Sequence, residues 1–203
     1  SEDLGGFYLD ILKDRLYTAG TATRARRSAQ NALYQMTQAL VRLMAPVLSF
    51  TANEVWETLN GGAVSVFEQT WYQCPLPREA SALRARWQKL RGLRGDVQKL
   101  LGELRVTGKI GSSLAGEVDL YAEGENHSFL ESFADDLRFV TITSAATVSP
   151  GDALVVRVTP SGHPKCERCW HWRADVGADA AHPTLCGRCV ANLFGAGEPR
   201  QFA

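Results

Sequence analysis

Four cysteines near the end of the 203-residue sequence are arranged in two pairs. Cys166 and Cys169 form one Cys-x-x-Cys pair, Cys186 and Cys189 form the other, and sixteen residues separate them. This spacing is typical of a four-cysteine zinc ribbon, because two such turns can bring four thiolates to one ion at Zn–S distances of about 2.3 Å. We therefore expect these four residues to bind one zinc ion.

The role of this ion follows from its ligands. Four cysteines close the tetrahedral shell, whereas a catalytic zinc keeps one position open, so we predict a structural site. The segment is rich in glycine and proline and has few apolar residues, so metal binding would be part of its folding. A redox role is disfavoured, because a redox Cys-x-x-Cys normally belongs to a βαβ unit and here the pair is doubled.

Other residues near the four cysteines allow more than one interpretation. His171 or His182 could replace a cysteine ligand, although the doubled pair makes them surplus. Trp170 and Trp172 lie in so small a module that we expect at least one to be exposed, where it could stack on a base or contact another domain. The fifth cysteine, Cys74, is predicted to be a partly buried thiol.

The elements that must carry this ribbon are predicted to be mostly helical. Helices are expected over residues 4–17, which should be largely buried, from Ala29 to Pro46, and from Thr51 to Asn60. The Thr51 helix would begin with a capping box formed with Glu54. The apolar positions of the second helix recur with the period of a helix in a bundle: Ala29, Leu33, Met36, Leu40, Leu43 and Val47.

A long basic helix is predicted from about Ala80 to Val106, ending before Lys109-Ile-Gly-Ser-Ser-Leu. Strands are then expected at residues 118–121, 139–143 and 153–158, with a short helix from Ser128 to Leu137. The predicted fold class is therefore multi-domain α and α+β. Its expected parts are a helical bundle (1–77), the joining helix (78–112), a small α+β unit (113–160) and the zinc ribbon (161–203).

Charge is balanced over the whole chain, with 22 basic and 22 acidic residues. Locally it is not, because the segment from Arg78 to Lys109 has a net charge of +6 and that from Glu117 to Arg138 has −6. Four arginines share one edge of the long helix: Arg84, Arg91, Arg94 and Arg105. Such an edge could follow a phosphate backbone, or its side chains could cover hydrophobic seams.

No run of about 18 apolar residues and no signal-peptide core is present, so neither membrane insertion nor export is expected. We expect a cytoplasmic monomer that does not bind membranes. In that reducing compartment, cysteines favour metal binding over disulfides.

The sequence resembles the C-terminal region of bacterial-type isoleucyl-tRNA synthetases of class I, over nearly all of its length. The segments that carry the resemblance are FYLDILKDRLYT at Phe7, RRSAQNALY at Arg26, LVRLMAPVLSFTANEVWETL at Leu40, SVFEQTW at Ser65, KIGSSL at Lys109, and KCERCW, VG, HPTLCGRCV and GE near the end. The segment around Pro46 is similar to the anticodon-binding bundle shared by the class I enzymes for isoleucine, valine, leucine and methionine. The resemblance therefore implies that the helical bundle of residues 1–77 is of the class I anticodon-binding type. KIGSSL and the terminal ribbon point to isoleucine.

The resemblance implies a partner and a division of labour. The family ligates isoleucine to its tRNA with ATP in a Rossmann-type domain and edits in an inserted domain, but this sequence has no His-x-Gly-His, Lys-Met-Ser-Lys-Ser or glycine-rich phosphate motif. The chain is therefore not expected to be an enzyme by itself, and ATP would bind elsewhere. It would hold the anticodon arm of isoleucine tRNA. The candidate contacts are Arg84, Arg91, Arg94, Arg105, Arg168, Trp170, His171, Trp172, Arg173 and Arg188.

Two other functions stay open. The chain could be a structural appendage whose ribbon packs on the remainder of the synthetase and has little RNA affinity of its own. It could also be an independent zinc-ribbon adaptor for nucleic acids.

Overall fold

The computed structural model describes residues 2–62 and 64–202. They form two compact units, one made of the segments up to Arg26 and from Ala82 onward, the other of Arg27–Ser81. We call them unit 1 and unit 2. The finer division into four parts stays a prediction.

Unit 1 begins with a helix that changes from π-helical to α-helical geometry. Glu2–Leu9 (η1) has π-helical geometry and continues as α1 (Asp10–Thr18), which confirms the predicted helix. Ile11 and Leu12 of α1 are buried, whereas η1 has no buried residue, so the expectation of a largely buried helix is wrong for its first half.

The long helix α4 spans Ala80–Val106, as predicted. Leu90, Leu93, Val97 and Leu101 form its buried face. These residues pack in the main core of unit 1 together with strand β1 and the helices that follow it.

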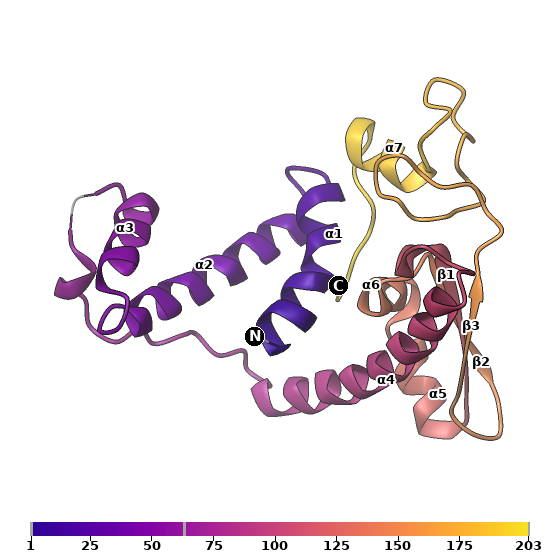
Figure 1. The fold of residues 1–203 in the computed structure, drawn as a ribbon, viewed down its shortest axis with the longest axis horizontal. Helices are drawn as coiled ribbons and strands as arrows, with labels where there is room; N and C mark the ends of the chain where they lie inside the picture. The colour runs from indigo at the N-terminus through magenta and orange to yellow at the C-terminus, as the bar shows by residue number, and fades with distance from the viewer. Residues whose placement is uncertain (1, 63, 203) are drawn as a thin grey trace. The chain divides into compact units, whose positions relative to one another are not determined.

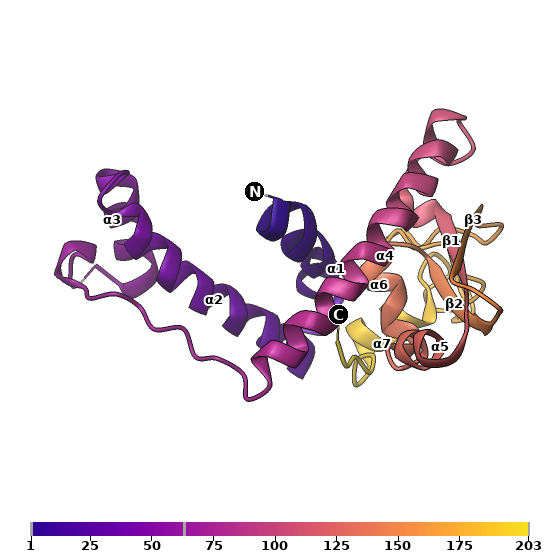
Figure 2. The same ribbon diagram turned by 90° about the horizontal axis from the view of Figure 1, so that it is seen from below.

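The sheet of unit 1 has the order β2-β1-β3, with β1 (Gly116–Ala122) parallel to β2 (Ala145–Pro150) and antiparallel to β3 (Val155–Pro160). Alternate residues of β1, such as Val118 and Leu120, are buried on one face, and Figures 1 and 2 show α4 and α6 on one side of the sheet. Gly116 fits this contact, because a Cβ there would lie 2.6 Å from Leu101 Cδ2.

The connection from β1 to β2 differs from the prediction. It contains α5 (Gly124–Glu131), a 3-10 turn (Ala134–Asp136) and α6 (Leu137–Thr141). The predicted strand at 139–143 is therefore wrong, and β2 was not predicted. Phe139 and Val140 belong to a short apolar run, which does not distinguish a buried strand from a buried helix, and in the structure they lie in the core as part of α6. The predicted helix from Ser128 instead begins at Gly124.

The zinc-ribbon segment contains little regular structure. Lys165 and Trp172 form an isolated antiparallel bridge, and α7 spans Gly187–Phe194. The chain then returns to the core, where the Phe202 ring packs 5.0 Å from that of Phe133.

Unit 2 contains most of α2 (Arg24–Met44), all of α3 (Ser49–Asn60) and a 3-10 turn (Val66–Glu68). Pro46 follows the end of α2, and Gly61 ends α3 with φ 75°, as expected for a left-handed cap. The predicted capping box is wrong, because α3 begins at Ser49 and Thr51 lies inside it. The Ser49 hydroxyl donates to the carbonyl of Ala45 at 3.0 Å.

The core of unit 2 is small. It consists of Val41, Ala45, Ala52, Trp56 and Val66, with Met44 against it. Most of the predicted bundle face of α2 is not buried. Leu40, Leu43 and Val47 are 42%, 54% and 80% exposed, because α3 covers the neighbouring face that carries Val41 and Ala45. No described helix is both long and apolar enough to cross a lipid bilayer.

Candidate metal centre and adjoining cavities

The four predicted metal ligands meet at one point of unit 1. Their sulfur atoms all lie within 4.8 Å of one another, and all four residues are buried. The Sγ atoms of Cys169 and Cys186 are 3.7 Å apart. A tetrahedral zinc with Zn–S bonds of about 2.3 Å requires about 3.8 Å between sulfurs, so the residues fit the ion.

Hydrogen bonds around the sulfurs support the same conclusion. The Cys186 N–H donates to Cys166 Sγ at 3.4 Å, and Arg168 Nη1 lies 3.6 Å from Cys189 Sγ. Hydrogen bonds with the thiols of Cys169 and Cys186 lower the pKa of Cys189 to about 4, whereas hydrogen bonds with Cys186 and Cys189 raise the pKa of Cys169. Four crowded thiols therefore compete for one another's protons, and a dication that attracts four thiolates would remove this conflict.

Neither histidine belongs to the sulfur cluster in the described part of the chain. The His182 ring stacks on that of Phe194 at 4.1 Å. His171 is only 2% exposed, and its Nδ1 lies 3.2 Å from the Cys169 carbonyl. Burial lowers the pKa of His171 to about 4 against the opposing charge of Asp14, so its ring is neutral at neutral pH. The prediction that Cys74 is a partly buried thiol is wrong, because this residue is exposed.

An unpredicted ionic network lies beside the metal centre. Arg188 pairs with Asp14 of α1 and, at 2.6 Å, with Glu198 of the C-terminal tail. Arg200 lies 2.6 Å from the same Asp14 carboxylate and 3.5 Å from Glu198. Burial disfavours the charge on Arg188, but the two carboxylates outweigh it and raise its pKa. The network joins α1, α7 and the tail.

Residues 174 positions apart make the contact between Asp14 and Arg188, so no local pattern predicts it. The only signal was that Asp14 and Glu198 both lie in segments that carry the family resemblance.

The charged residues of the ribbon that were predicted to contact RNA form hydrogen bonds or ion pairs with other residues of unit 1. Arg188 is buried, with its side chain 3% exposed, and Arg173 pairs with Asp175 through two hydrogen bonds of 2.8 and 3.0 Å. Arg168 Nη1 donates to the Thr18 carbonyl at 2.8 Å. We therefore withdraw the buried Arg188 and His171 as RNA contacts.

The two tryptophans of the ribbon have different surroundings. Trp172 is half-buried, packs against the main core and donates its backbone N–H to Ser144 Oγ at 2.6 Å. Trp170 is 61% exposed, as expected for one member of the pair. Trp170 is thus the ribbon's candidate for stacking on a base.

The arginine edge of α4 is not uniform. Arg94 lies in the buried face, with its side chain 5% exposed, 2.8 Å from the Asp10 carboxylate and 2.9 Å from the Gly6 carbonyl. This pairing leaves it no surface for a phosphate, so it is also withdrawn. Arg84, Arg91 and Arg105 are exposed.

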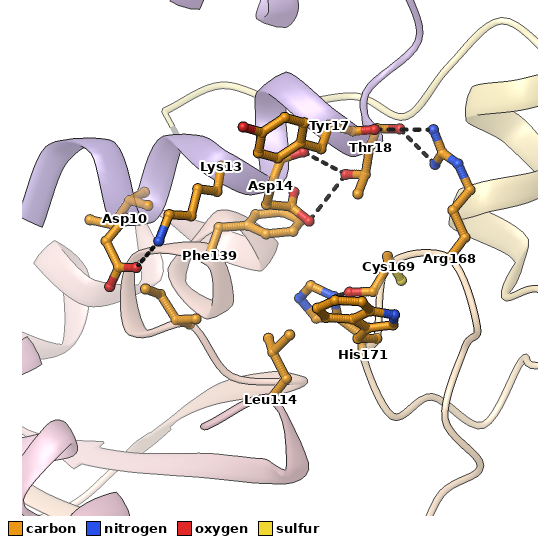
Figure 3. Close-up of a pocket in the computed structure, with 13 residues that line it drawn as sticks. Asp10, Lys13, Asp14, Tyr17, Thr18, Leu114, Phe139, Arg168, Cys169 and His171 are labelled. Carbon is orange, nitrogen blue, oxygen red and sulfur yellow. Dashed lines mark hydrogen bonds and ion pairs between the residues drawn. The ribbon is translucent and has the colours of Figure 1, made fainter. Parts of the chain in front are cut away.

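An apolar cavity of about 470 Å³ lies next to the metal centre (Figure 3). Its wall comes from α1, from Leu114, from the end of α6 and from the first cysteine turn of the ribbon. Figure 3 shows Asp10 and Lys13 at one side, His171 and Cys169 at the other, and Leu114 below them.

A second, more polar cavity of about 390 Å³ adjoins it. Arg105, Ser112 and Ser113 line it, so it carries part of the KIGSSL segment. The two cavities have three lining residues in common, namely Asp10, Leu114 and Ile142.

Comparison with known proteins agrees with this arrangement. The family described as "Anticodon-binding domain of tRNA ligase" matches residues 1–120, and "Zinc finger found in FPG and IleRS" matches residues 164–192. Similar curated proteins are the isoleucine–tRNA ligases of Bordetella parapertussis, Ralstonia pickettii and a Janthinobacterium species. Each is 56% identical over the whole chain, which covers 22% of its relative.

The chain thus spans about a fifth of the length of these relatives and matches their C-terminal part. The anticodon-binding match covers more than half of the chain and the zinc-finger match coincides with the sulfur cluster. We conclude that the chain belongs to the anticodon-binding family of tRNA ligases and corresponds to the C-terminal region of isoleucine–tRNA ligases.

Proposed function

We propose that this chain binds the anticodon arm of isoleucine tRNA and positions the tRNA for catalytic domains that lie elsewhere in the full-length synthetase. One observation carries the proposal: the chain contains matches to an anticodon-binding domain and to a zinc finger, and over its whole length it is 56% identical to about a fifth of an isoleucine–tRNA ligase. One structural zinc ion would hold the ribbon. Ligation and ATP binding would belong to the rest of the protein.

The surface of unit 1 supports an RNA partner. Arg84, Arg91 and Arg105 provide exposed cations on α4, and Trp170 provides an exposed ring on the ribbon. Phosphate contacts give salt-dependent affinity, whereas stacking engages unpaired bases.

A second candidate is a structural appendage with little RNA affinity. It is favoured by the internal use of the ribbon's charges, since Arg168, Arg173 and Arg188 all bind partners within unit 1. In that case the ribbon would mainly stabilise its parent.

Binding measurements separate the two. The zinc-loaded chain is titrated with an isoleucine tRNA transcript and with the same transcript carrying an altered anticodon, at one salt concentration. We expect tighter binding of the unaltered transcript. Equal binding would limit the chain to positioning the tRNA without reading its anticodon, and no measurable binding would favour the structural appendage.

Arg91→Ala is expected to reduce the salt dependence of tRNA binding. The Arg91 side chain is 45% exposed, and its partner Asp3 is 84% exposed, so a phosphate can replace this carboxylate at little cost. Loss of one phosphate contact should reduce the slope of log K against log salt by about one. Arg157→Ala, which removes an exposed arginine from β3, is the matched control and should keep the slope. An unchanged slope in Arg91→Ala would remove Arg91 from the RNA contacts.

A further inference from the structure

We propose that the two adjoining cavities form one site for a single unpaired ribonucleotide of the tRNA. The base would occupy the apolar cavity, the phosphate would lie in the polar one, and the ribose would lie between them. The inference rests on the proposed function and adds to it a location, a ligand class and a set of residues in α1 and KIGSSL.

The apolar cavity suits a base. Its volume of about 470 Å³ falls within the range of about 300–1,000 Å³ of small-ligand sites. Ile11, Leu114 and Phe139 provide apolar walls, while Tyr17 and Trp170 line the cavity and are 75% and 61% exposed. Exposed rings at the mouth of an apolar cavity can stack on an unpaired base.

The polar cavity suits a phosphate. Arg105 Nη2 donates to Ser113 Oγ at 2.9 Å, so a guanidinium and a hydroxyl stand side by side in its wall, with Ser112 next to them. Arginine hydrogen bonds to phosphate oxygens are charge-assisted and strong. In this site Ser112 and Ser113 of the KIGSSL segment would bind the phosphate together with Arg105.

The shared residue Asp10 suits a ribose. Its Oδ2 pairs with Arg94 at 2.8 Å and its Oδ1 with Lys13 at 3.1 Å, so its charge is compensated and does not repel a phosphate. A carboxylate is an acceptor only, and a 2′-hydroxyl can donate to it. The site should therefore prefer RNA to DNA.

Two residues with an unusual backbone conformation also line the apolar cavity. Ile142 and Trp170, with φ 58° and 63°, are the two non-glycine residues with positive φ in the described chain, and both line the apolar cavity. A left-handed conformation is costly for a β-branched or bulky residue and is often found at ligand sites. Here it holds Ile142 at the junction of the cavities and Trp170 at the mouth.

The test uses the zinc-loaded chain and two variants that act in opposite ways. Trp170→Ala removes the stacking ring, whereas Leu114→Trp fills the junction. Phe194→Ala removes another exposed ring of the same ribbon outside both cavities and serves as the control. Fluorescence anisotropy gives Kd for an isoleucine tRNA transcript and for matched ribo- and deoxyribopentamers, and circular dichroism checks folding.

We expect Trp170→Ala and Leu114→Trp each to weaken tRNA binding about 5- to 100-fold, the range for loss of one base–aromatic stack, and Phe194→Ala to leave it unchanged. The ribopentamer should bind more tightly than the deoxyribopentamer. Wild-type tRNA affinity in both folded variants would overturn the nucleotide site and leave the proposed function standing.

Failure of the proposed function gives a different pattern. If the wild-type chain binds no tRNA, the proposed function is overturned, and the pentamers decide the nucleotide site separately. Ribopentamer binding that Leu114→Trp abolishes would support the site, and no pentamer binding would overturn it. Equal affinity for RNA and DNA would overturn the assignment of the ribose to Asp10.

Discussion

Cys186→Ser is expected to release the zinc ion and to unfold the ribbon. The apolar support of the four cysteines consists of Val176 and Leu185, so little hydrophobic burial remains when the metal is lost. Zinc binding by structural sites is worth about 10–16 kcal/mol in zinc-finger peptides, and this free energy is folding free energy. The loss is therefore comparable to the whole stability of an ordinary domain, about 5–15 kcal/mol.

The measurement combines metal content with limited proteolysis. The wild-type chain should carry one zinc per chain and resist cleavage between residues 161 and 195, whereas Cys186→Ser should contain no zinc and be cut there. Cys74→Ser is the matched control, because Cys74 is exposed and outside the sulfur cluster. A folded ribbon that contains no metal would refute the zinc assignment.

Asp14→Ala is expected to destabilise unit 1 by about 3–5 kcal/mol, the cost of removing one partner from a buried ion pair. The change removes one of the carboxylates that pair with Arg188 and Arg200, whose side chains are 3% and 0% exposed. It also removes a carboxylate that accepts a hydrogen bond from Thr18. Urea unfolding followed by circular dichroism measures the loss.

Asp3→Ala provides the control for this effect. Asp3 also pairs with an arginine, but its side chain is 84% exposed, so its loss should cost at most about 1 kcal/mol. Equal stabilities of the two variants would show that the buried network contributes no more than a surface pair.

The same carboxylate predicts a pH dependence. Burial alone would raise the pKa of Asp14, but the charges of Arg188 and Arg200 outweigh it and lower the pKa below its usual value. A lowered pKa in the folded state gives stability that is present above about pH 4, the unfolded value, and is lost as pH falls through the folded value. The stability difference between the wild type and Asp14→Ala should therefore shrink on acidification. Acid also releases zinc, and the ribbon that carries Arg188 would unfold with the metal, so the zinc content of both proteins is followed at each pH. A difference that stays constant below about pH 4 while both proteins keep their zinc would contradict the assignment.

A loosened network has a consequence for RNA binding as well. Asp14 and Thr18 belong to the wall of the apolar cavity, and the network joins α1 to the ribbon that forms the opposite wall. Asp14→Ala should therefore also weaken tRNA binding.

The sequence by itself determined the metal centre and the long helix. Two Cys-x-x-Cys turns place their thiolates by local geometry, so spacing alone identified all four residues that converge in the structure. The bounds of α4 were predictable because 27 residues of regular apolar periodicity leave little ambiguity. The family resemblance also came from local segments.

Tertiary structure alone decided which charges and which short apolar runs are buried. Arg91 and Arg94 share a helix edge in the sequence, but Asp10, 84 positions before Arg94, holds one of them in the core. Phe139 and Val140 suited a strand until core packing placed them in α6. The cavities also depend on segments that are distant in the sequence. Burial and pairing are set by such distant partners, and local periodicity carries no information about them.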